Sequence, residues 1–281
     1  MLVIADSGST KADWMVQGDH GTQRITTMGF NPVFHPTELI YEELTKSFAD
    51  QADKDSPGLV YYYGSGCWDS KRKKVISDAL SKIFVRAEIK VEHDLLGAAR
   101  ATCGNQPGIA CIIGTGSNSC LYDGEDIKDN VTNLGYLIGD EGSGTHLGKR
   151  LIRAYFYREL PHDLLEKFEK FAPQGPGHIL DTIYGKDTPN VYLASFTKFL
   201  GENRDHFFVQ RLLYKSFTEF IDRHVRKYKG HMSLPVHFIG SIAYTFQDII
   251  KIALEERDLK VGKFIKKPID HLFSFHTSTD N

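Results

Sequence analysis

The sequence lacks the features that identify disulfide-rich, membrane-spanning and nucleic-acid-coating proteins. Only 4 of its 281 residues are cysteine, none in CxxC spacing, which argues against a disulfide scaffold and predicts buried reduced thiols. No apolar run approaches the roughly 18 residues that a transmembrane helix needs. Lys and Arg total 34 against 36 Asp and Glu, so the strong positive charge of a nucleic-acid-coating protein is missing. We therefore expect a globular protein with neither membrane nor nucleic acid as a partner.

Common targeting and cofactor motifs are also missing. The N-terminus has no basic stretch followed by an apolar one, so we expect no signal peptide and a cytoplasmic protein. The 12 histidines include no HExxH pair, which predicts no structural metal. Gly148-Lys149 is followed by Arg150 rather than Ser or Thr, so there is no Walker A motif.

Strand and helix signals alternate along the chain, which predicts a mixed α/β sheet flanked by helices. Apolar runs predict strands over 2–5, 14–16, 59–63, 87–91, 109–113, 120–122 and 236–239. Helical spacing predicts helices over 36–51, 70–84, 95–102, 145–159, 162–171, 190–200, 204–228, from the 240s to about 256, and 269–275.

The strand–turn–strand pattern at the start of the chain occurs a second time after residue 108. Residues 104–108 are the best linker candidate, and a strand, a Gly/Ser/Thr turn and a second strand follow them, as at the N-terminus. An offset of 108 aligns Gly8 with Gly116. We interpret this as an internal duplication.

The two copied turns are the first candidates for chemistry. Asp6-Ser-Gly-Ser-Thr-Lys11 and Gly114-Thr-Gly-Ser-Asn118 are small and polar, so their N–H groups could cradle phosphate oxygens. Asp6 ends a buried strand, where a carboxylate is costly unless it is paired or near a metal such as a phosphate-bound Mg²⁺. Each turn alone is equally consistent with an ordinary hairpin. Two equivalent turns favour a shared polyphosphate.

Two acidic sites have a functional and a structural interpretation. Asp140 and Glu141 lie in a glycine-rich loop before a helix, where they could bind hydroxyls or a metal, or act on the helix N-terminus. Asp94 follows a strand and precedes a helix of small residues. It could serve as a general base toward a sugar hydroxyl, or cap the helix.

Four stretches together resemble the N-acetylglucosamine kinase branch of the BadF/BadG/BcrA/BcrD ATPase family, within the superfamily of sugar kinases, actin and heat-shock ATPases. They are Asp6-Ser-Gly-Ser-Thr-Lys-Ala-Asp-Trp14, Gly114-Thr-Gly-Ser-Asn118, Gly135-Tyr-Leu-Ile-Gly-Asp-Glu-Gly-Ser-Gly144 and Gly240-Ser-Ile-Ala243. The resemblance covers nearly the whole chain, and the first and third stretches are the most specific.

This resemblance implies an α/β fold of duplicated ribonuclease H-like domains, the actin-like ATPase fold, with ATP in a cleft between them. The N-terminal domain would comprise residues 1–106 and 269–281, because the last helix is expected to cross back to it. The C-terminal domain would comprise residues 107–268.

The resemblance also assigns residues to ligands, with ATP and Mg²⁺ as cofactors, Asp6 toward the metal and Asp94 as catalytic base. The implied nucleotide-binding residues are Asp6, Gly8, Ser9, Thr10, Lys11, Gly114, Thr115, Gly116, Ser117, Gly240, Ser241 and Ala243. The implied sugar-binding residues are Asn31, Asp94, Thr115, Gly116, Asn133, Leu134 and Asp140.

The sequence departs from the family pattern at two places. Ser7 and Ser9 replace glycines of the usual Asp-Gly-Gly-Gly-Thr-Lys. Thr132-Asn133-Leu134 stands where Gly-Gly-Trp is usual. Because a tryptophan near the sugar is missing, we hypothesise that the substrate choice differs from plain N-acetylglucosamine.

The predicted reaction is phosphoryl transfer from MgATP to an amino sugar, first of all to the 6-hydroxyl of N-acetylglucosamine, with Asp94 accepting the proton. The alternatives are a kinase for glucosamine, N-acetylmuramic acid or another hexose derivative, a non-catalytic sugar sensor, and an ATP-driven dehydratase activator. Such activators hold an iron–sulfur cluster at a dimer interface, whereas Cys111 and Cys120 are expected to be internal. The sequence is also compatible with a homodimer.

Overall fold

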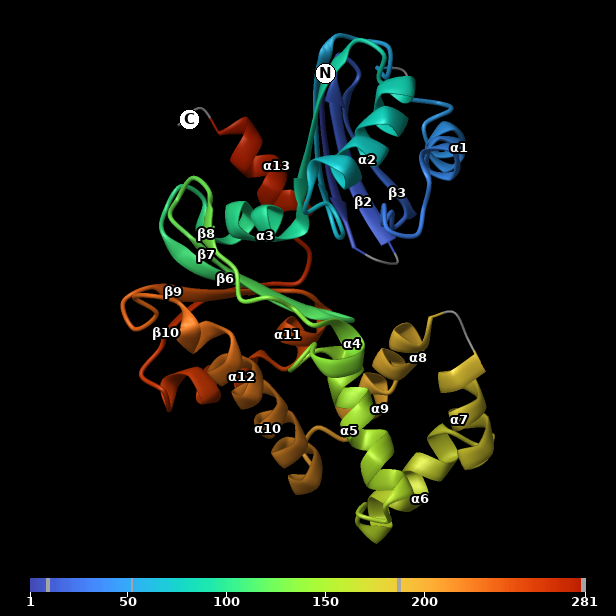
Figure 1. The fold of residues 1–281 in the computed structure, drawn as a ribbon, viewed down its shortest axis with the longest axis vertical. Coiled ribbons are helices and arrows are strands. Elements are labelled where there is room, and N and C mark those ends of the chain that lie inside the picture. Colours follow the sequence, from blue (N-terminus) through green and yellow to red (C-terminus); the bar gives the residue numbers. More distant parts are fainter. Residues whose placement is uncertain (9–10, 52, 186–187, 279–281) are drawn as a thin grey trace. The chain divides into compact units, whose positions relative to one another are not determined.

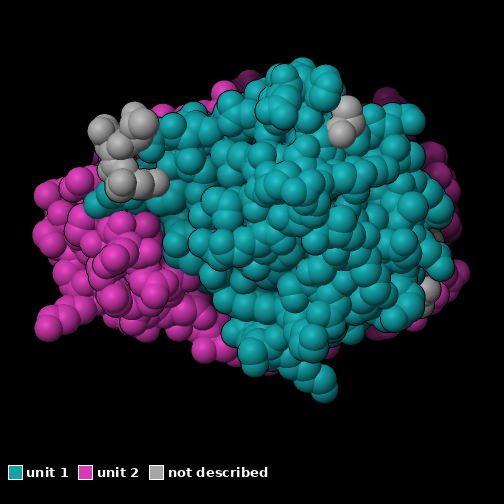
Figure 2. Space-filling model, turned by 90° about the horizontal axis from the view of Figure 1, so that it is seen from above, with its two compact units in different colours: residues 1–105, 267–281 teal, residues 106–266 magenta. Residues whose placement is uncertain are grey.

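The computed structural model describes residues 1–8, 11–51, 53–185 and 188–278. The chain divides into two compact units, coloured teal and magenta in Figure 2. Unit 1 comprises Met1–Asn105 and Lys267–Asn281, and unit 2 comprises Gln106–Lys266. Each unit has its own five-stranded sheet (Figure 1). No helix among the described residues combines the length and the apolar character needed to span a membrane.

Unit 1 is built on a mixed sheet with the strand order β3-β2-β1-β4-β5. Its strands are Leu2–Ser7 (β1), Lys11–Gly18 (β2), Gly21–Met28 (β3), Gly58–Gly64 (β4) and Ala87–His93 (β5). Its helices are Thr37–Ser47 (α1), Ser70–Ile83 (α2), Asp94–Cys103 (α3) and Ile269–Thr277 (α13). Strand β1 pairs antiparallel with β2 and parallel with β4. The chain therefore enters the unit as a hairpin and continues as parallel strands.

Helices cover both faces of this sheet. Figure 1 shows α1 and α2 on one side and α3 and α13 on the other. Since side chains alternate along a strand, the consecutive tyrosines of β4 divide between the two faces. Tyr62 packs into the core with Trp14 and Phe48. Tyr63 lies under α3, where a Cβ on Gly97 would come within 2.9 Å of its side chain.

Unit 2 has a sheet with the order β10-β9-β6-β7-β8. Its strands are Gly108–Ile113 (β6), Ser117–Tyr122 (β7), Ile127–Asp129 (β8), Pro235–Ile239 (β9) and Lys260–Ile265 (β10). Its helices are Gly135–Ile138 (α4), Gly144–Phe156 (α5), His162–Phe171 (α6), Gly175–Gly185 (α7), Pro189–Ser195 (α8), Thr197–Glu202 (α9), Phe207–Arg223 (α10), the 3-10 turn Val225–Lys227 (η1), Ser241–Thr245 (α11) and Gln247–Glu255 (α12). Helices α5, α10 and α12 lie on one side of the sheet (Figure 1). They bury aromatic and aliphatic side chains against it, among them Phe217, Phe220 and Ile250.

The two sheets have the same topology. Strands β6, β7, β8, β9 and β10 take the places of β1, β2, β3, β4 and β5, with the same antiparallel and parallel pairings. The prediction of an α/β fold with a duplicated sheet is therefore confirmed.

The offset of 108 is wrong. The last pair of the first hairpin is Ser7 with Ala12, and that of the second is Ile113 with Ser117. The copies are thus offset by 106 residues before the turn and by 105 after it. The second turn is one residue shorter, so an alignment without gaps matched the wrong glycines. Gly8 corresponds to Gly114, each being the first residue of its turn.

Several elements differ from their predicted bounds. The sequence indicated neither the edge strands β3, β8 and β10 nor helix α7. Strand β3 is mostly exposed, with the sequence Gly-Thr-Gln-Arg-Ile-Thr-Thr-Met, so it lacks the apolar run that predicts a strand. The helix predicted over 204–228 is α10 followed by η1. It begins later because His206 caps α10 by accepting the Phe208 N–H.

Candidate functional site

The first glycine-rich turn joins β1 to β2 in unit 1. The Gly8 N–H donates to the Lys11 carbonyl over 3.0 Å. Among the described residues, a Cβ on Gly8 would meet nothing closer than that carbonyl, at 3.7 Å, and the φ of Gly8 is not positive. Neither packing nor conformation demands glycine here, so the bare backbone leaves room for a ligand to approach closely. The predicted Ser9 and Thr10 lie outside the described residues.

Lys11 follows this turn as the first residue of β2, and its side chain is exposed. Its ammonium group lies 2.9 Å from the Asp13 carboxylate, and the hydrogen bond to Asp13 raises the pKa of Lys11. Asp13 also pairs with Lys267 at 3.2 Å. The cation at the turn is therefore oriented by an acid two residues further along the same strand, β2.

Asp6, near the end of β1, is held in an unfavourable electrostatic position. Burial, followed by the negative charges of Asp94 and Asp13, raises the pKa of Asp6 to about 7, against the opposing effect of Lys267. A nearby cation would favour the charged carboxylate, so this position fits the predicted Mg²⁺. Among the described residues, no three His, Cys, Asp or Glu side chains form a group that could hold a metal. Phosphate oxygens and water would have to complete such a site.

Asp94 is the first residue of α3, at the end of β5. The His93 ring caps this helix, because its Nδ1 accepts the Leu95 N–H at 3.2 Å. The capping interpretation of Asp94 is therefore not what the structure shows. Asp94 Oδ1 is buried and has no hydrogen-bond partner within the described part of the chain. It is an acceptor that a substrate hydroxyl could use.

The same ring nitrogen lies 2.9 Å from Asp94 Oδ1. In the neutral ring, an Nδ1 that accepts from Leu95 carries no proton to donate to Asp94. Burial lowers the pKa of His93, but the Asp94 charge outweighs this, and the pKa ends above its ordinary value. Protonation of His93 would exchange the helix cap for an ion pair with Asp94.

The loop that carries Asn31 is tied to two strands of unit 1. Ser7 Oγ accepts the Phe30 N–H at 3.0 Å, and the Tyr62 hydroxyl donates to the Phe30 carbonyl at 3.2 Å. Asn31 Oδ1 accepts the Val33 N–H, whereas its Nδ2 makes no hydrogen bond to any described residue and can donate to a ligand. The departure at Ser7 thus has a structural reason, because glycine could not hold Phe30.

The second turn, in unit 2, is anchored by the N-terminus of α5. The Gly114 N–H donates to the Gly116 carbonyl at 2.9 Å, and the Gly144 N–H to the Gly114 carbonyl at 2.8 Å. Both the N–H and the hydroxyl of Thr145 donate to the Thr115 carbonyl. A Cβ on Gly114 would meet no atom within 4 Å. This turn is rigidly held and open on one side, as a phosphate-binding turn requires.

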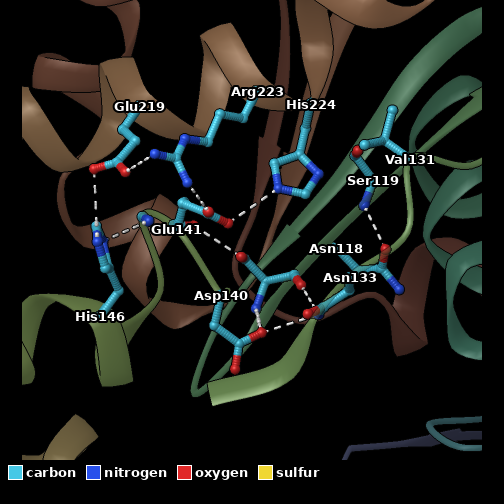
Figure 3. Close-up of polar contacts among 12 residues, drawn as sticks. Asn118, Ser119, Val131, Asn133, Asp140, Glu141, His146, Glu219, Arg223 and His224 are labelled. Carbon is cyan, nitrogen blue, oxygen red and sulfur yellow. Dashed lines mark hydrogen bonds and ion pairs between the residues drawn. The ribbon is translucent and has the colours of Figure 1, made fainter. Parts of the chain in front are cut away.

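Asp140 is the central acid of unit 2 (Figure 3). Its Oδ1 accepts the Ser117 N–H at 3.1 Å and the Asn133 Nδ2 at 2.9 Å. Its φ of 57° is rare outside glycine. Burial raises the pKa of Asp140, although both of these hydrogen bonds oppose it. Oδ2 makes no hydrogen bond within the described part of the chain, which leaves an acceptor for a ligand hydroxyl.

Asn133 and Leu134, both predicted to contact the sugar, differ in what they offer. Asn133 is engaged within the protein: its Nδ2 donates to the Ser117 carbonyl and to Asp140, and its Oδ1 accepts the Gly135 N–H. It orients Asp140 and has little left for a ligand. Leu134 is 58% exposed and presents an apolar surface beside it.

Glu141 is committed to ion pairs. Its carboxylate lies 2.7 Å from Arg223 and 3.2 Å from His224 (Figure 3). Burial raises the pKa of Glu141, but the hydrogen bonds from its own backbone, His224 and Arg223 bring it below its ordinary value. The Ser117 hydroxyl donates to the Glu141 carbonyl. Of the two adjacent acids, only Asp140 remains available to a ligand.

The stretch from Gly240 to Ala243 links β9 to α11. Gly240 has a φ of 117°, and a Cβ there would come within 2.3 Å of the Ile113 carbonyl. Glycine is therefore required to bring this stretch against the second turn. Ser241 is exposed, whereas Ala243 is fully buried in the core of unit 2. The side chain of Ala243 can support a binding surface only from beneath.

In unit 1, Asp94 lies close enough to Asp6 for its charge to raise the pKa of Asp6. In unit 2, Gly116, Ser117 and Asn133 lie against Asp140. Sequence analysis missed the residues that position them: Tyr62, Thr145, and His93 as the helix cap. Only His93 carried a signal, since a polar residue before a helix of small residues is a typical cap position. The contacts of Tyr62 and Thr145 are made far along the sequence and leave no local pattern.

The four cysteines lie in the interior. Cys111 and Cys120, on β6 and β7, have no exposed surface. Neither presents a thiol at the surface of unit 2, where an iron–sulfur cluster shared between two copies would need it.

Solved structures similar to this chain include several described as sugar kinases. A proposed N-acetylglucosamine kinase from Porphyromonas gingivalis is 36% identical, with 98% of each chain covered and a TM-score of 0.92. A proposed N-acetylglucosamine kinase from Chromobacterium violaceum is 17% identical, with 98% of each chain covered and a TM-score of 0.75. A ROK family glucokinase from Streptomyces griseus, in complex with glucose and AMPPNP, is 13% identical, with 98% of this chain and 97% of that chain covered and a TM-score of 0.56. The last two show the fold alone. No protein-family model matches the chain.

Proposed function

This chain belongs to the N-acetylglucosamine kinase branch of the BadF/BadG/BcrA/BcrD ATPase family and is an ATP-dependent carbohydrate kinase; we propose that it phosphorylates the 6-hydroxyl of an amino sugar. N-Acetylglucosamine is the first candidate, because the relative from Porphyromonas gingivalis is described as a proposed kinase for that sugar. Glucosamine, N-acetylmuramic acid and other hexose derivatives are the alternatives. They differ only in what surrounds the reacting hydroxyl.

The observation that carries this proposal is the state of Asp94. Its Oδ1 is buried and accepts no hydrogen bond from any described residue while the neighbouring His93 ring is neutral, because Nδ1 of that ring caps the helix instead. A buried unsatisfied acceptor is costly, so its persistence points to use by a ligand. We assign Asp94 the proton of the attacking hydroxyl, which gives a more nucleophilic oxygen toward the γ-phosphorus.

The two turns supply the proposed nucleotide contacts. The space beside Gly8 and Gly114 would let phosphate oxygens approach the backbone. The N–H groups of these two glycines already donate to Lys11 and Gly116, so in the second turn the contacts would fall to the N–H groups of Thr115 and Gly116, and Lys11 would add a cation at the first turn. Gly240 and Ser241 would border the adenosine. When bound near Asp6, Mg²⁺ would neutralise phosphate charge. The raised pKa of Asp6 supports a cation at this position, because the carboxylate is poorly stabilised by the protein alone.

We assign the sugar contacts to side-chain hydrogen-bonding groups that have no partner among the described residues. Asp140 Oδ2 and Asn31 Nδ2 would bind hydroxyl groups, and the backbone at Thr115 and Gly116 would pass between sugar and phosphate. Asn133 acts by orienting Asp140. Leu134 offers apolar contact where a tryptophan is usual, so we expect weaker selection for the N-acetyl group than an indole would give.

A substrate panel with MgATP tests the proposal. ADP release is measured with N-acetylglucosamine, glucosamine, N-acetylmannosamine, N-acetylmuramic acid and glucose, for the wild type and Asp94→Asn. We expect release that depends on the sugar, with kcat in Asp94→Asn lower by about 10²–10⁴-fold and with sugar binding retained. Near-normal turnover of Asp94→Asn would exclude it as the base. Absence of release with every sugar would favour a sensor.

A further inference from the structure

Unit 2 contains a hollow that none of the proposed nucleotide and sugar contacts explains. It has a volume of about 620 Å³ and lies between α5 and α10, with Leu137, Ile138 and Gly139 at one end. No residue of the glycine-rich turn at 114–118 lines it. Its size is within the range of small-molecule sites, about 300–1,000 Å³.

Positive charge dominates its walls. Six cationic side chains line it against three carboxylates, an excess of three positive charges in a chain whose net charge is −2. The cations are Lys149, Arg150, Arg153, Arg211, Lys215 and Arg223, and the acids are Glu141, Glu159 and Glu219. His146, also in the wall, adds no charge at neutral pH, since burial and the charges of Arg150 and Lys149 lower its pKa to about 4.

One end of the hollow is internally neutralised. Arg223 lies 2.7 Å from Glu141 and 2.9 Å from Glu219, and Arg150 also pairs with Glu219. The Lys149 ammonium donates to the Tyr136 carbonyl. Figure 3 shows Arg223 between Glu141 and Glu219. These groups satisfy one another and need no ligand.

The other end is not neutralised. Arg153, Arg211 and Lys215 form no ion pair with any acid in the described part of the chain; Arg211 only stacks over Phe208, 5.9 Å from the ring centroid. Glu159 lines the hollow but likewise makes no ion pair with a described residue. Arg211 and Lys215 are one helical turn apart on α10, so their side chains lie on the same face. Three cations that line one hollow without acidic partners among the described residues create a positive potential that favours an anion there.

We propose that this hollow is a binding site for a small phosphorylated molecule, whose phosphate is held by Arg153, Arg211 and Lys215. Guanidinium groups match phosphate oxygens in geometry and charge. Exposed Leu137, Ile138 and Tyr157 would contact an apolar or sugar part of the ligand. The volume of about 620 Å³ matches a small molecule.

The site adjoins the proposed sugar-binding acid. Gly139 and Glu141 line the hollow, and Asp140 between them binds Ser117 and Asn133 on the opposite side. A ligand that attracts Arg223 away from Glu141 would loosen this loop. Its effect on sugar affinity rests on the proposed function, but its binding does not.

Calorimetric titration with inorganic pyrophosphate at constant ionic strength, without nucleotide or Mg²⁺, tests the site. The variants are Arg211→Gln/Lys215→Gln in the hollow, Lys11→Gln at the first turn, and Lys167→Gln/Lys170→Gln as a matched pair of exposed lysines on α6. Arg211 and Lys215 are themselves exposed, so the variant should fold. We expect its affinity for pyrophosphate to fall by about tenfold or more, with the other two variants unchanged at this site.

Wild-type affinity in the hollow variant would overturn the proposal, as would failure of the wild type to bind pyrophosphate. A loss that follows Lys11→Gln alone would assign the binding to the nucleotide turn and would also overturn it. Sugar-dependent ADP release is measured on the same variants and should persist in Arg211→Gln/Lys215→Gln. If no variant or wild type releases ADP while the hollow binds pyrophosphate, the kinase proposal fails and the anion site stands.

Discussion

The Nδ1 of His93 caps the helix that begins with Asp94 and lies 2.9 Å from the Asp94 carboxylate. Two adjacent residues therefore divide two tasks that sequence analysis placed on one. The ring satisfies the helix N-terminus, and the carboxylate keeps a free acceptor. The first prediction tests this division.

His93→Ala is expected to lower the free energy of unfolding by about 1 kcal/mol, the usual cost of a lost cap, and to lower kcat because Asp94 can then turn to the helix N–H groups. His93→Asn is the matched control, since an Asn side chain can accept the Leu95 N–H. Urea unfolding and steady-state kinetics provide the measurements. If His93→Asn restores neither stability nor kcat relative to His93→Ala, capping by His93 does not position Asp94.

Asp6→Asn is expected to stabilise the ligand-free protein while abolishing turnover. The pKa of Asp6 is about 7 in the folded protein and 3.8 in its ordinary state. Between these values the folded state holds a proton that the unfolded state has lost, so Asp6 destabilises the fold increasingly as pH rises through this window. The variant should gain on the order of 2 kcal/mol at about pH 8 and less at about pH 5.

Urea unfolding at both pH values measures the gain, with Asp13→Asn as a control. Asp13 has a lowered pKa, mainly through its partners Lys11 and Lys267, which outweigh its burial. Its removal should therefore destabilise the protein at about pH 8. An Asp6→Asn variant that loses stability at that pH would contradict the assignment of Asp6 as an electrostatically strained carboxylate.

Gly114→Ala separates the demands of folding from those of ligand binding. A Cβ at Gly114 meets no atom within 4 Å, and the φ there is not positive. The free energy of unfolding should change by less than about 0.5 kcal/mol. Because a methyl group would occupy the space proposed for a phosphate, the KM for ATP should rise by about tenfold or more.

Alanine substitutions at two further glycines serve as controls for Gly114→Ala. Gly201 is equally open, so Gly201→Ala should leave both stability and KM for ATP near the wild type. Gly240→Ala should unfold the protein or destabilise unit 2 severely, because its Cβ would come within 2.3 Å of the Ile113 carbonyl at a positive φ. An unchanged KM for ATP in Gly114→Ala would remove this turn from the nucleotide site.

Tyr62→Phe should affect the sugar more than the nucleotide. The variant leaves the buried Phe30 carbonyl without the Tyr62 hydroxyl, at a cost of about 1–3 kcal/mol, and loosens the loop that carries Asn31. We expect a several-fold rise in KM for the sugar and little change in KM for ATP, measured under saturating co-substrate. Tyr61→Phe, on the opposite face of β4, should change neither. Equal rises in both KM values for Tyr62→Phe would indicate a general structural defect.

The hydrophobic pattern was sufficient to predict the central strands, most helices and the duplicated sheet. It failed at the edges, because edge strands such as β3 bury too little surface to need apolar side chains. It also failed at the turn length, since a one-residue deletion shifts the strands that follow without changing their character. The family resemblance was confirmed by the 36% identical relative.

Local sequence could not separate the roles of adjacent polar residues. Asp140 and Glu141 look equivalent in the sequence, yet the Glu141 carboxylate is bound by Arg223 and His224, more than 80 residues away. Asn133 could be predicted near the sugar but not as the support of Asp140. Such roles depend on which groups the fold leaves unsatisfied, and these are determined by tertiary contacts.

Helix α13 has a consequence for the order in which the protein is made. It packs on α3, β1 and β2, with the His276 ring stacked 3.8 Å from that of Tyr61 and its Nε2 2.7 Å from the Tyr63 hydroxyl. Unit 2 is one continuous segment, whereas unit 1 is split around it. All five strands of unit 1 precede unit 2 in the chain, so during synthesis only the docking of α13 must wait until unit 2 has been made. Until then the His276 ring is not yet stacked on Tyr61. The unit that is begun first is therefore completed last.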